Sequence, residues 1–204
     1  MDNTAQKLTP LQQEILKRWQ KKSGSGVSQE VKDELTLKFD GEVLLNEPMS
    51  LHSTMRVGGK ASIFLKPRTK DALKFAIRLA EERGLSYFFH GGGSNTLVKD
   101  GGVSGFVIST LGVFTHHEVR EKADDHIDLF VESGLSFPGL LVLAKDLGAA
   151  DLAPLTGIPG SVGGAVLMNA GVPTREMKDV VRSITVITRA GEEIEISREK
   201  LPFE

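Results

Sequence analysis

The sequence contains no cysteine, which excludes disulfide bonds, thiolate nucleophiles and cysteine-ligated zinc. Five histidines remain as candidate soft metal ligands among the 204 residues. Any redox chemistry would therefore have to come from a bound cofactor. The length suits one globular domain with a small appendage.

Long apolar runs and an excess of either charge are missing as well. No apolar run approaches the roughly 20 residues that cross a bilayer, and the polar first ten residues lack a signal-peptide core. We therefore expect a cytoplasmic protein that is not bound to a membrane. The 25 basic and 27 acidic residues give a net charge of −2. This balance gives no electrostatic reason to expect nucleic acid as a partner.

The pattern of apolar residues predicts a helical appendage over residues 1–40. Thr9 and Pro10 are typical of a helix start, and Leu11, Ile15 and Trp19 then share one stripe. Ser28 is expected to cap a second short helix. The Trp19 stripe can either dock on the main body or recruit a partner, and docking is favoured because such stripes usually serve packing.

Residues 41–204 are predicted to form an α/β unit. Strands are expected at 61–65 and 85–90, with a helix between them that Thr69 caps. Further strands are expected at 105–109 and 127–132. A helix should follow Ser136, and a hairpin should join 180–188 to 192–196. This order places a glycine-rich loop at the carboxyl end of a strand.

Glycine is abundant, at 22 residues or about one in nine against an average near 7%. The first cluster follows the strand that ends at His90. Bare backbone N–H groups there can point at one anionic ligand, since no side chain blocks its approach. A tight surface turn is the alternative. The residues of this loop are Gly91, Gly92, Gly93, Ser94 and Asn95.

The second cluster predicts a turn at Pro159-Gly160 followed by a short helix that Ser161 caps. The positive amino-terminal end of that helix would favour an anion. Close helix packing by the small residues is the alternative. Two such loops in one small domain make a dinucleotide more plausible than either loop alone. The candidate residues are Gly157, Ile158, Pro159, Gly160, Ser161, Gly163 and Gly164.

The commoner nucleotide and metal motifs do not fit. The triple glycine leads into an extended segment rather than a helix, unlike a Rossmann fingerprint, and Gly58-Gly59-Lys60-Ala61 lacks the hydroxyl of a P-loop. His116-His117 is read as a solvated strand end, because adjacent side chains diverge and no metal-binding spacing surrounds them. We therefore predict no metal site and assign no catalytic residue. His90 is either a pocket wall or simply the last residue of its strand.

Taken in order, three motifs resemble the UDP-N-acetylenolpyruvoylglucosamine reductase (UDP-N-acetylmuramate dehydrogenase) family over roughly residues 41–204. They are Ser53-Thr54-Met55-Arg56-Val57-Gly58-Gly59, Gly91 to Val98 with Asp100-Gly101-Gly102, and Gly157 to Gly164 with Asn169-Ala170-Gly171. The resemblance implies an α+β FAD-binding fold of the vanillyl-alcohol-oxidase (PCMH) type, with two small subdomains around an extended FAD. It places FAD at the two glycine-rich clusters.

The resemblance also implies the activity. Hydride would pass from NADPH through FAD to UDP-N-acetylglucosamine enolpyruvate, in peptidoglycan synthesis. The family implies non-covalent FAD, although His52 and His90 are the conceivable covalent anchors. No oligomeric state is predicted.

The sequence departs from the family pattern at two places. The Tyr-Gly-x-Glu stretch that often follows Asn169-Ala170-Gly171 is replaced by Val172-Pro173-Thr174-Arg175-Glu176, in which Glu176 alone can keep its role. The catalytic Tyr-Arg-x-Ser motif, the Gly-Ser-x-Phe motif and the late glutamate cannot be matched. We expect a fragment that lacks the carboxyl-terminal substrate domain, binds FAD and is inactive alone. Alternatives are the FAD domain of another oxidase or dehydrogenase, or a non-catalytic scaffold paralogue.

Overall fold

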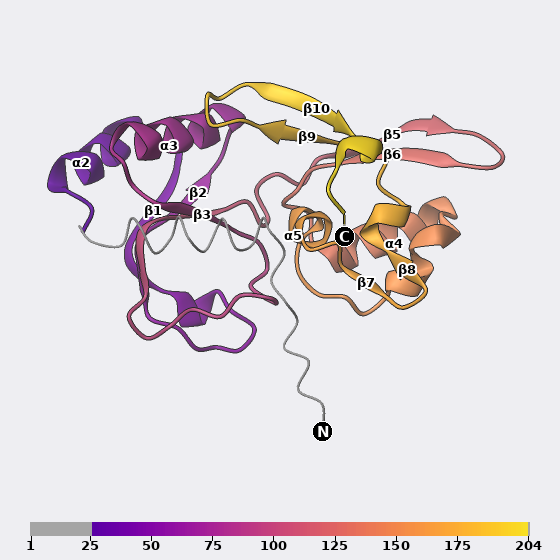
Figure 1. Ribbon diagram of the computed structural model, residues 1–204, viewed down its shortest axis with the longest axis horizontal. Coiled ribbons are helices and arrows are strands. Elements are labelled where there is room, and N and C mark those ends of the chain that lie inside the picture. Colours follow the sequence, from indigo (N-terminus) through magenta and orange to yellow (C-terminus); the bar gives the residue numbers. More distant parts are fainter. Residues whose placement is uncertain (1–25, 204) are drawn as a thin grey trace.

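The computed structural model describes residues 26–203. The helix predicted from Thr9, with its stripe of Leu11, Ile15 and Trp19, lies outside the described residues. The described chain forms two units that each have a core, and a hairpin spans them (Figure 1).

The first unit is built on a four-stranded sheet with the order β1-β2-β4-β3. Strand β1 (Gly41–Pro48) is antiparallel to β2 (Lys60–Pro67). Strand β4 (Val103–Ser109) is parallel to both β2 and β3 (Tyr87–His90). The predicted strand, helix, strand unit is therefore present, with β4 inserted between its two strands. The carboxyl ends of the three parallel strands meet at one edge of the sheet.

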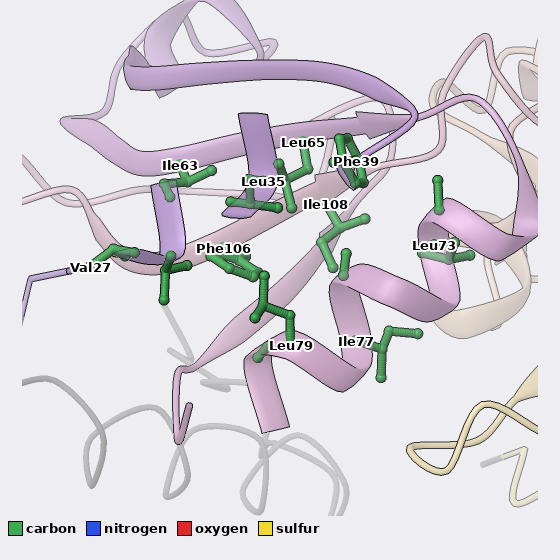
Figure 2. Close-up of a cluster of buried hydrophobic side chains, with 14 of the residues drawn as sticks. Val27, Leu35, Phe39, Ile63, Leu65, Leu73, Ile77, Leu79, Phe106 and Ile108 are labelled. Atoms are coloured by element: carbon green, nitrogen blue, oxygen red, sulfur yellow. The ribbon is translucent and has the colours of Figure 1, made fainter. Parts of the chain in front are cut away.

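Two helices cover one face of this sheet. Helix α2 (Gln29–Lys38) begins at Ser28 and α3 (Lys70–Glu82) at Thr69, and each of these hydroxyls accepts a hydrogen bond from an N–H of the first turn. Figure 2 shows the apolar side chains packed between the helices and the sheet, so α2 shares the core of the sheet. The core includes Val31, Leu35, Phe39, Ile63, Leu65, Ala76, Ile77, Ala80, Phe106 and Ile108.

Loops cover the opposite face of the sheet, beginning with the 3-10 helix η1 (Met49–Leu51). Successive residues of a strand point to opposite faces, so Ile63 and Leu65 meet the helices whereas Phe64 meets the loops. The buried residues on the loop side are Met49, Ala61, Phe64, Val98, Val103 and Val107, with Phe88 packed against them. His90 lies two residues beyond Phe88 and therefore on the same face.

The second unit is smaller and has its own core. It contains the hairpin β5 (His117–Lys122) with β6 (Ile127–Val131), helices α4 (Phe137–Leu147) and α5 (Val162–Leu167), and the short hairpin β7 (Gly171–Val172) with β8 (Arg175–Glu176). The 3-10 helices η2 (Ala150–Leu155) and η3 (Met177–Asp179) lie between these elements. The core is formed by Phe137, Leu140, Leu155, Val162, Ala165 and Met177.

The hairpin β9 (Ser183–Ile187) with β10 (Glu193–Ser197) spans the two units. Figure 1 shows it reaching from the second unit across to α3. At the end of the hairpin near α3, the Glu193 carboxylate forms ion pairs with the ammonium groups of Lys70 (3.2 Å) and Lys74 (2.8 Å). At the other end, Arg182 pairs with Asp128 of β6 at 2.8 Å. The 3-10 helix η4 (Arg198–Lys200) follows.

Most of the predicted elements are present with ends that differ by at most three residues, but β1, β5 and the two-residue strands β7 and β8 were not predicted. Strand β1 carries a continuous Val43-Leu44-Leu45 run rather than an alternating pattern, since both of its faces are partly covered. Strand β5 is exposed along its whole length and has no apolar face for a pattern to reveal. No helix within 26–203 is long and apolar enough to span a membrane.

Candidate cofactor site

The triple-glycine loop starts where β3 ends, as predicted. The Thr54 N–H donates to the Gly93 carbonyl at 3.2 Å. This hydrogen bond anchors the loop through a carbonyl and does not use any of the loop's own N–H groups. No N–H group from Gly91 to Asn95 donates a hydrogen bond to a residue within 26–203. Gly93 has a φ of +67°, a conformation that side chains disfavour. The loop therefore offers free N–H groups to a ligand.

The two glycine-rich loops touch each other. A methyl group added at Gly92 would lie 2.7 Å from the Cα atom of Gly160. One added at Gly160 would lie 2.9 Å from the Ser94 hydroxyl, and one added at Gly91 would overlap the Ser161 hydroxyl. The two glycine-rich loops therefore lie directly against each other, and only glycine permits this backbone approach.

A third loop, residues 51–59, completes the site and was not among the predicted site residues. It packs on the triple glycine so closely that a methyl group at Gly93 would overlap the His52 carbonyl. The Ser53 hydroxyl donates to the Val57 carbonyl at 3.1 Å. The sequence did carry a signal here: Gly58-Gly59, of which Gly58 has a φ of +131°.

The triple-glycine loop and the loop of residues 51–59 line an open cavity of about 470 Å³ at the carboxyl ends of the parallel strands, and the second glycine-rich loop lies outside its lining. Lys66 comes from the end of β2, His90 from the end of β3 and Ser109 from the end of β4. Ligands of open α/β sheets bind at this edge, where side chains and loop amides converge. The other lining residues are Leu51, His52, Ser53, Thr54, Arg56, Gly91, Gly92 and Leu111.

The charges around the cavity are positive. Arg56 and Lys66 line it, and no carboxylate of the described chain does. Lys66 is paired with Glu42 at 3.0 Å. Arg56 forms no ion pair within the described chain, and its backbone φ of +54° is unusual for a residue with a side chain. A free guanidinium beside free N–H groups suits an anionic ligand.

His90 is a buried wall of this cavity, which decides between the two interpretations left open by the sequence. His90 is 3% exposed, and neither of its ring nitrogens has a hydrogen-bond partner within 26–203. The pKa of His90 is lowered to about 4, mainly by burial of the ring and to a smaller extent by the charge of His52. The Gly91 backbone opposes this pKa shift without forming a hydrogen bond of ordinary geometry. His90 is therefore neutral at physiological pH.

Aromatic rings and a second histidine surround His90. The rings of Phe64 and Phe88 meet it edge-on, with centroids 6.1 and 6.2 Å away. The His52 ring stacks on Phe64 at 4.1 Å, and its Nε2 lies 2.8 Å from Glu47 Oε1. The Glu47 contact and the stacking fix the orientation of His52 beside the His90 ring.

The amino-terminal end of α5 does not present free N–H groups, contrary to the expectation that it attracts an anion. Gly163 donates to the Ser133 carbonyl at 2.9 Å, and Gly164 donates to the Ser161 hydroxyl at 3.2 Å. The helix is only six residues long, so its dipole is small. Ile158 packs into the second core and Pro159 is exposed. The N–H groups of Gly157, Gly160 and Ser161 have no acceptor within 26–203.

Glu176 is engaged in holding the β7–β8 hairpin. It accepts from the Asn169 side chain at 2.9 Å and forms an ion pair with Lys178. These two hydrogen bonds, Lys178 first, lower the pKa of its carboxyl. His116 and His117 are exposed at the start of β5, and the described residues contain no cluster of three metal-binding side chains.

Comparison with known proteins identifies the domain. The family model described as "FAD binding domain" matches residues 61–197. The chain belongs to this FAD binding domain family. Structures of low identity share its fold: a 4-ethylphenol oxidase from Gulosibacter chungangensis has a TM-score of 0.61 at 22% identity, covering 88% of this chain and 37% of the oxidase. The fold is the α+β, two-subdomain FAD-binding fold of the vanillyl-alcohol-oxidase type, as the resemblance implied.

Relatives of higher identity are UDP-N-acetylenolpyruvoylglucosamine reductases. The one from Clostridioides difficile is 37% identical over 79% of this chain and 52% of its own length, and the one from Exiguobacterium sibiricum is 38% identical over 78% and 50%. The crystal structure of the Thermus caldophilus reductase has a TM-score of 0.62 at 31% identity, covering 80% of this chain and 55% of its own. The chain spans about half the length of the curated relatives it matches.

The site fits the cofactor after which this family is named. A dinucleotide needs donors for its diphosphate, and the two loops offer N–H groups that have no acceptor within the described chain. A methyl group at Gly91 or Gly92 would push the loops apart. Arg56 adds a positive charge, and His90 adds polar atoms that lack partners.

Proposed function

We propose that this chain binds FAD non-covalently across the contact between its two glycine-rich loops. The observation that carries the proposal is the meeting of Gly92 with Gly160, which brings both sets of N–H groups to one place. The proposed contacts are Gly91, Gly92, Gly93, Ser94, Asn95, Gly157, Ile158, Pro159, Gly160 and Ser161. Gly163 would support them by letting α5 pack closely against Ser133, and Gly164 by donating to the Ser161 hydroxyl that caps the helix.

FAD supplies hydride transfer when bound, and the residues of this chain supply binding and orientation. Backbone N–H groups from Gly91 to Asn95, with those of Gly160 and Ser161, would donate to the diphosphate. Arg56 would balance its negative charge. The ring of His90 and the apolar Leu51 and Leu111 would line the remainder of the cavity and exclude water.

We propose that the whole protein is an NADPH-dependent reductase of UDP-N-acetylglucosamine enolpyruvate in peptidoglycan synthesis, acting in the cytoplasm. The identity of 36–38% to reductases of that name supports the assignment. We assign residues 41–204 to its FAD-binding part and 1–40 to an amino-terminal extension, whose helix α2 packs into the core of that part. Because the three catalytic motifs of the family do not occur in the 204 residues, this chain alone should not complete the reaction.

One preparation tests both parts of this proposal. The purified chain is mixed with excess FAD, passed over a desalting column, and assayed for flavin absorbance and for consumption of NADPH with and without the enolpyruvyl substrate. We expect about one flavin per chain and no consumption that depends on substrate. Folded protein without flavin would contradict the FAD assignment. Turnover of the substrate would contradict the proposal that this chain alone does not complete the reaction.

A further inference from the structure

Burying His90 lowers the stability of the protein when no ligand is bound. Among the described residues, the buried side-chain atoms without a hydrogen-bond partner are Nδ1 and Nε2 of His90 and Nε of Arg175. Burying polar atoms without partners lowers stability, whereas an apolar ring of similar size would fill the same space without this loss. Both nitrogens of the His90 ring are unpaired within the described chain. This indicates that the side chain serves ligand binding rather than folding.

The position of His90 makes such a ligand contact possible. The residue ends β3, immediately before the free N–H groups of Gly91 and Gly92, and it lines the same cavity as those two glycines. Phe64, Phe88 and His52 surround its ring on the protein side. The residue lines the cavity, but each ring nitrogen has less than 1 Å² of exposed surface, so a hydrogen bond to a ligand there requires the ring or the Gly91 loop to shift slightly.

The chemistry of a neutral imidazole narrows the part of the ligand that it can bind. Such a ring carries one N–H donor and one bare nitrogen acceptor. A diphosphate offers acceptors only, and its natural partners here are the loop amides and Arg56. A hydroxyl or a cyclic amide offers both a donor and an acceptor, and FAD carries such groups in its sugar chain and its rings.

We propose that His90 is a binding residue for FAD, forming a hydrogen bond with a neutral hydroxyl or amide group of the flavin nucleotide next to the diphosphate. The inference rests on the proposed function. It assigns His90 a role that neither the sequence motifs nor the family match gives it.

The test compares two apolar variants with one polar variant and one matched control. His90→Phe and His90→Leu remove the nitrogens, and the leucine serves if the larger ring does not fit. His90→Gln retains a donor and an acceptor. His117→Phe makes the same aromatic substitution at an exposed position on β5. For each, the dissociation constant of FAD is measured at several salt concentrations, and stability without FAD by urea denaturation.

We expect the apolar variants to bind FAD about 5- to 30-fold more weakly, the loss of one or two hydrogen bonds. His90→Gln should stay within about threefold of the original, and His117→Phe should match it. The salt dependence of binding should be unchanged in His90→Phe and flatter in Arg56→Gln, since only the latter removes a charge. Without FAD, at least one apolar variant should be as stable as the original chain or more so.

Unchanged FAD affinity in the apolar variants would overturn the role of His90 while leaving the proposed function intact. Equal losses of affinity in His90→Gln and His90→Leu, each matched by a loss of stability without FAD, would also overturn it, because they indicate a purely structural residue. Failure of the unaltered chain to bind FAD would instead contradict the proposed function itself.

Discussion

At the scale of single residues, Gly92 is where the two loops depend most directly on the absence of a side chain. Alanine there would place a methyl group 2.7 Å from the Gly160 backbone, which cannot rotate away. We expect Gly92→Ala to lower the free energy of unfolding by about 1–3 kcal/mol, a typical cost of overpacking, and to weaken FAD binding about tenfold or more as the loops separate.

Gly101 provides the matched control for Gly92. It also lies in a glycine-rich turn, but a methyl group there would meet nothing within 4 Å. Gly101→Ala should change stability by less than about 0.5 kcal/mol and leave FAD binding unchanged. Denaturation curves and flavin titrations of both variants decide the matter, and equal effects at the two positions would argue against the loop contact.

His90 predicts a specific dependence of stability on pH. Its pKa lies at about 4 in the folded protein and near its ordinary 6.5 in the unfolded chain. The unfolded state therefore binds the proton more readily, so the stability that depends on neutral His90 is complete above pH 6.5 and is lost as the pH falls toward 4. Between pH 7 and 4.5 we expect a loss on the order of 2–3 kcal/mol.

The pH prediction is checked by denaturing the original chain and His90→Phe in urea at both pH values. The carboxylates that also titrate in this range are common to both proteins, so the difference between them isolates His90. His52 is the neighbouring titratable ring and is present in both. Identical losses of stability in the two proteins would show that burial of His90 does not perturb its protonation.

At the scale of elements, two serine caps hold the helices of the second unit and distinguish folding from binding. Ser136 caps α4 and Ser161 caps α5, each by accepting a hydrogen bond at 3.2 Å. Replacing either with alanine should cost about 1 kcal/mol of stability. Because the Ser161 hydroxyl abuts Gly91, we expect Ser161→Ala also to weaken FAD binding about fivefold. Measured affinities that fall equally in Ser136→Ala would contradict this distinction.

The elements show what the sequence could and could not reveal. Caps at Ser28, Thr69, Ser136 and Ser161 were all predicted, because capping is decided by residues that are close in the chain. The exposed β5 was missed because its pairing with β6 leaves no local pattern. The Ser133 carbonyl that binds the Gly163 N–H comes from tertiary packing and could not be predicted locally, whereas the Gly164 N–H is bound by the predicted Ser161 cap.

At the scale of the whole molecule, the site depends on how two separately packed units meet. The first core lies between the sheet and α2 and α3, the second around α4 and α5. The β9–β10 hairpin adds ion pairs between them, while the glycines supply the close backbone contact. The sequence located both loops and, through resemblance, the FAD-binding family. It did not reveal the cavity, because Lys66, His90 and Ser109 are brought together only by strand order.

The central claim is that free N–H groups of both loops bind one FAD, and amide NMR of the chain tests it most directly. On addition of FAD, the amide signals of Gly91 to Asn95 and of Gly160 and Ser161 should shift together with one dissociation constant and exchange more slowly with solvent. The amides of Gly163 and Gly164, already bonded within the protein, should gain no protection. Shifts confined to one loop, or protection of Gly163 and Gly164 alone, would contradict the account.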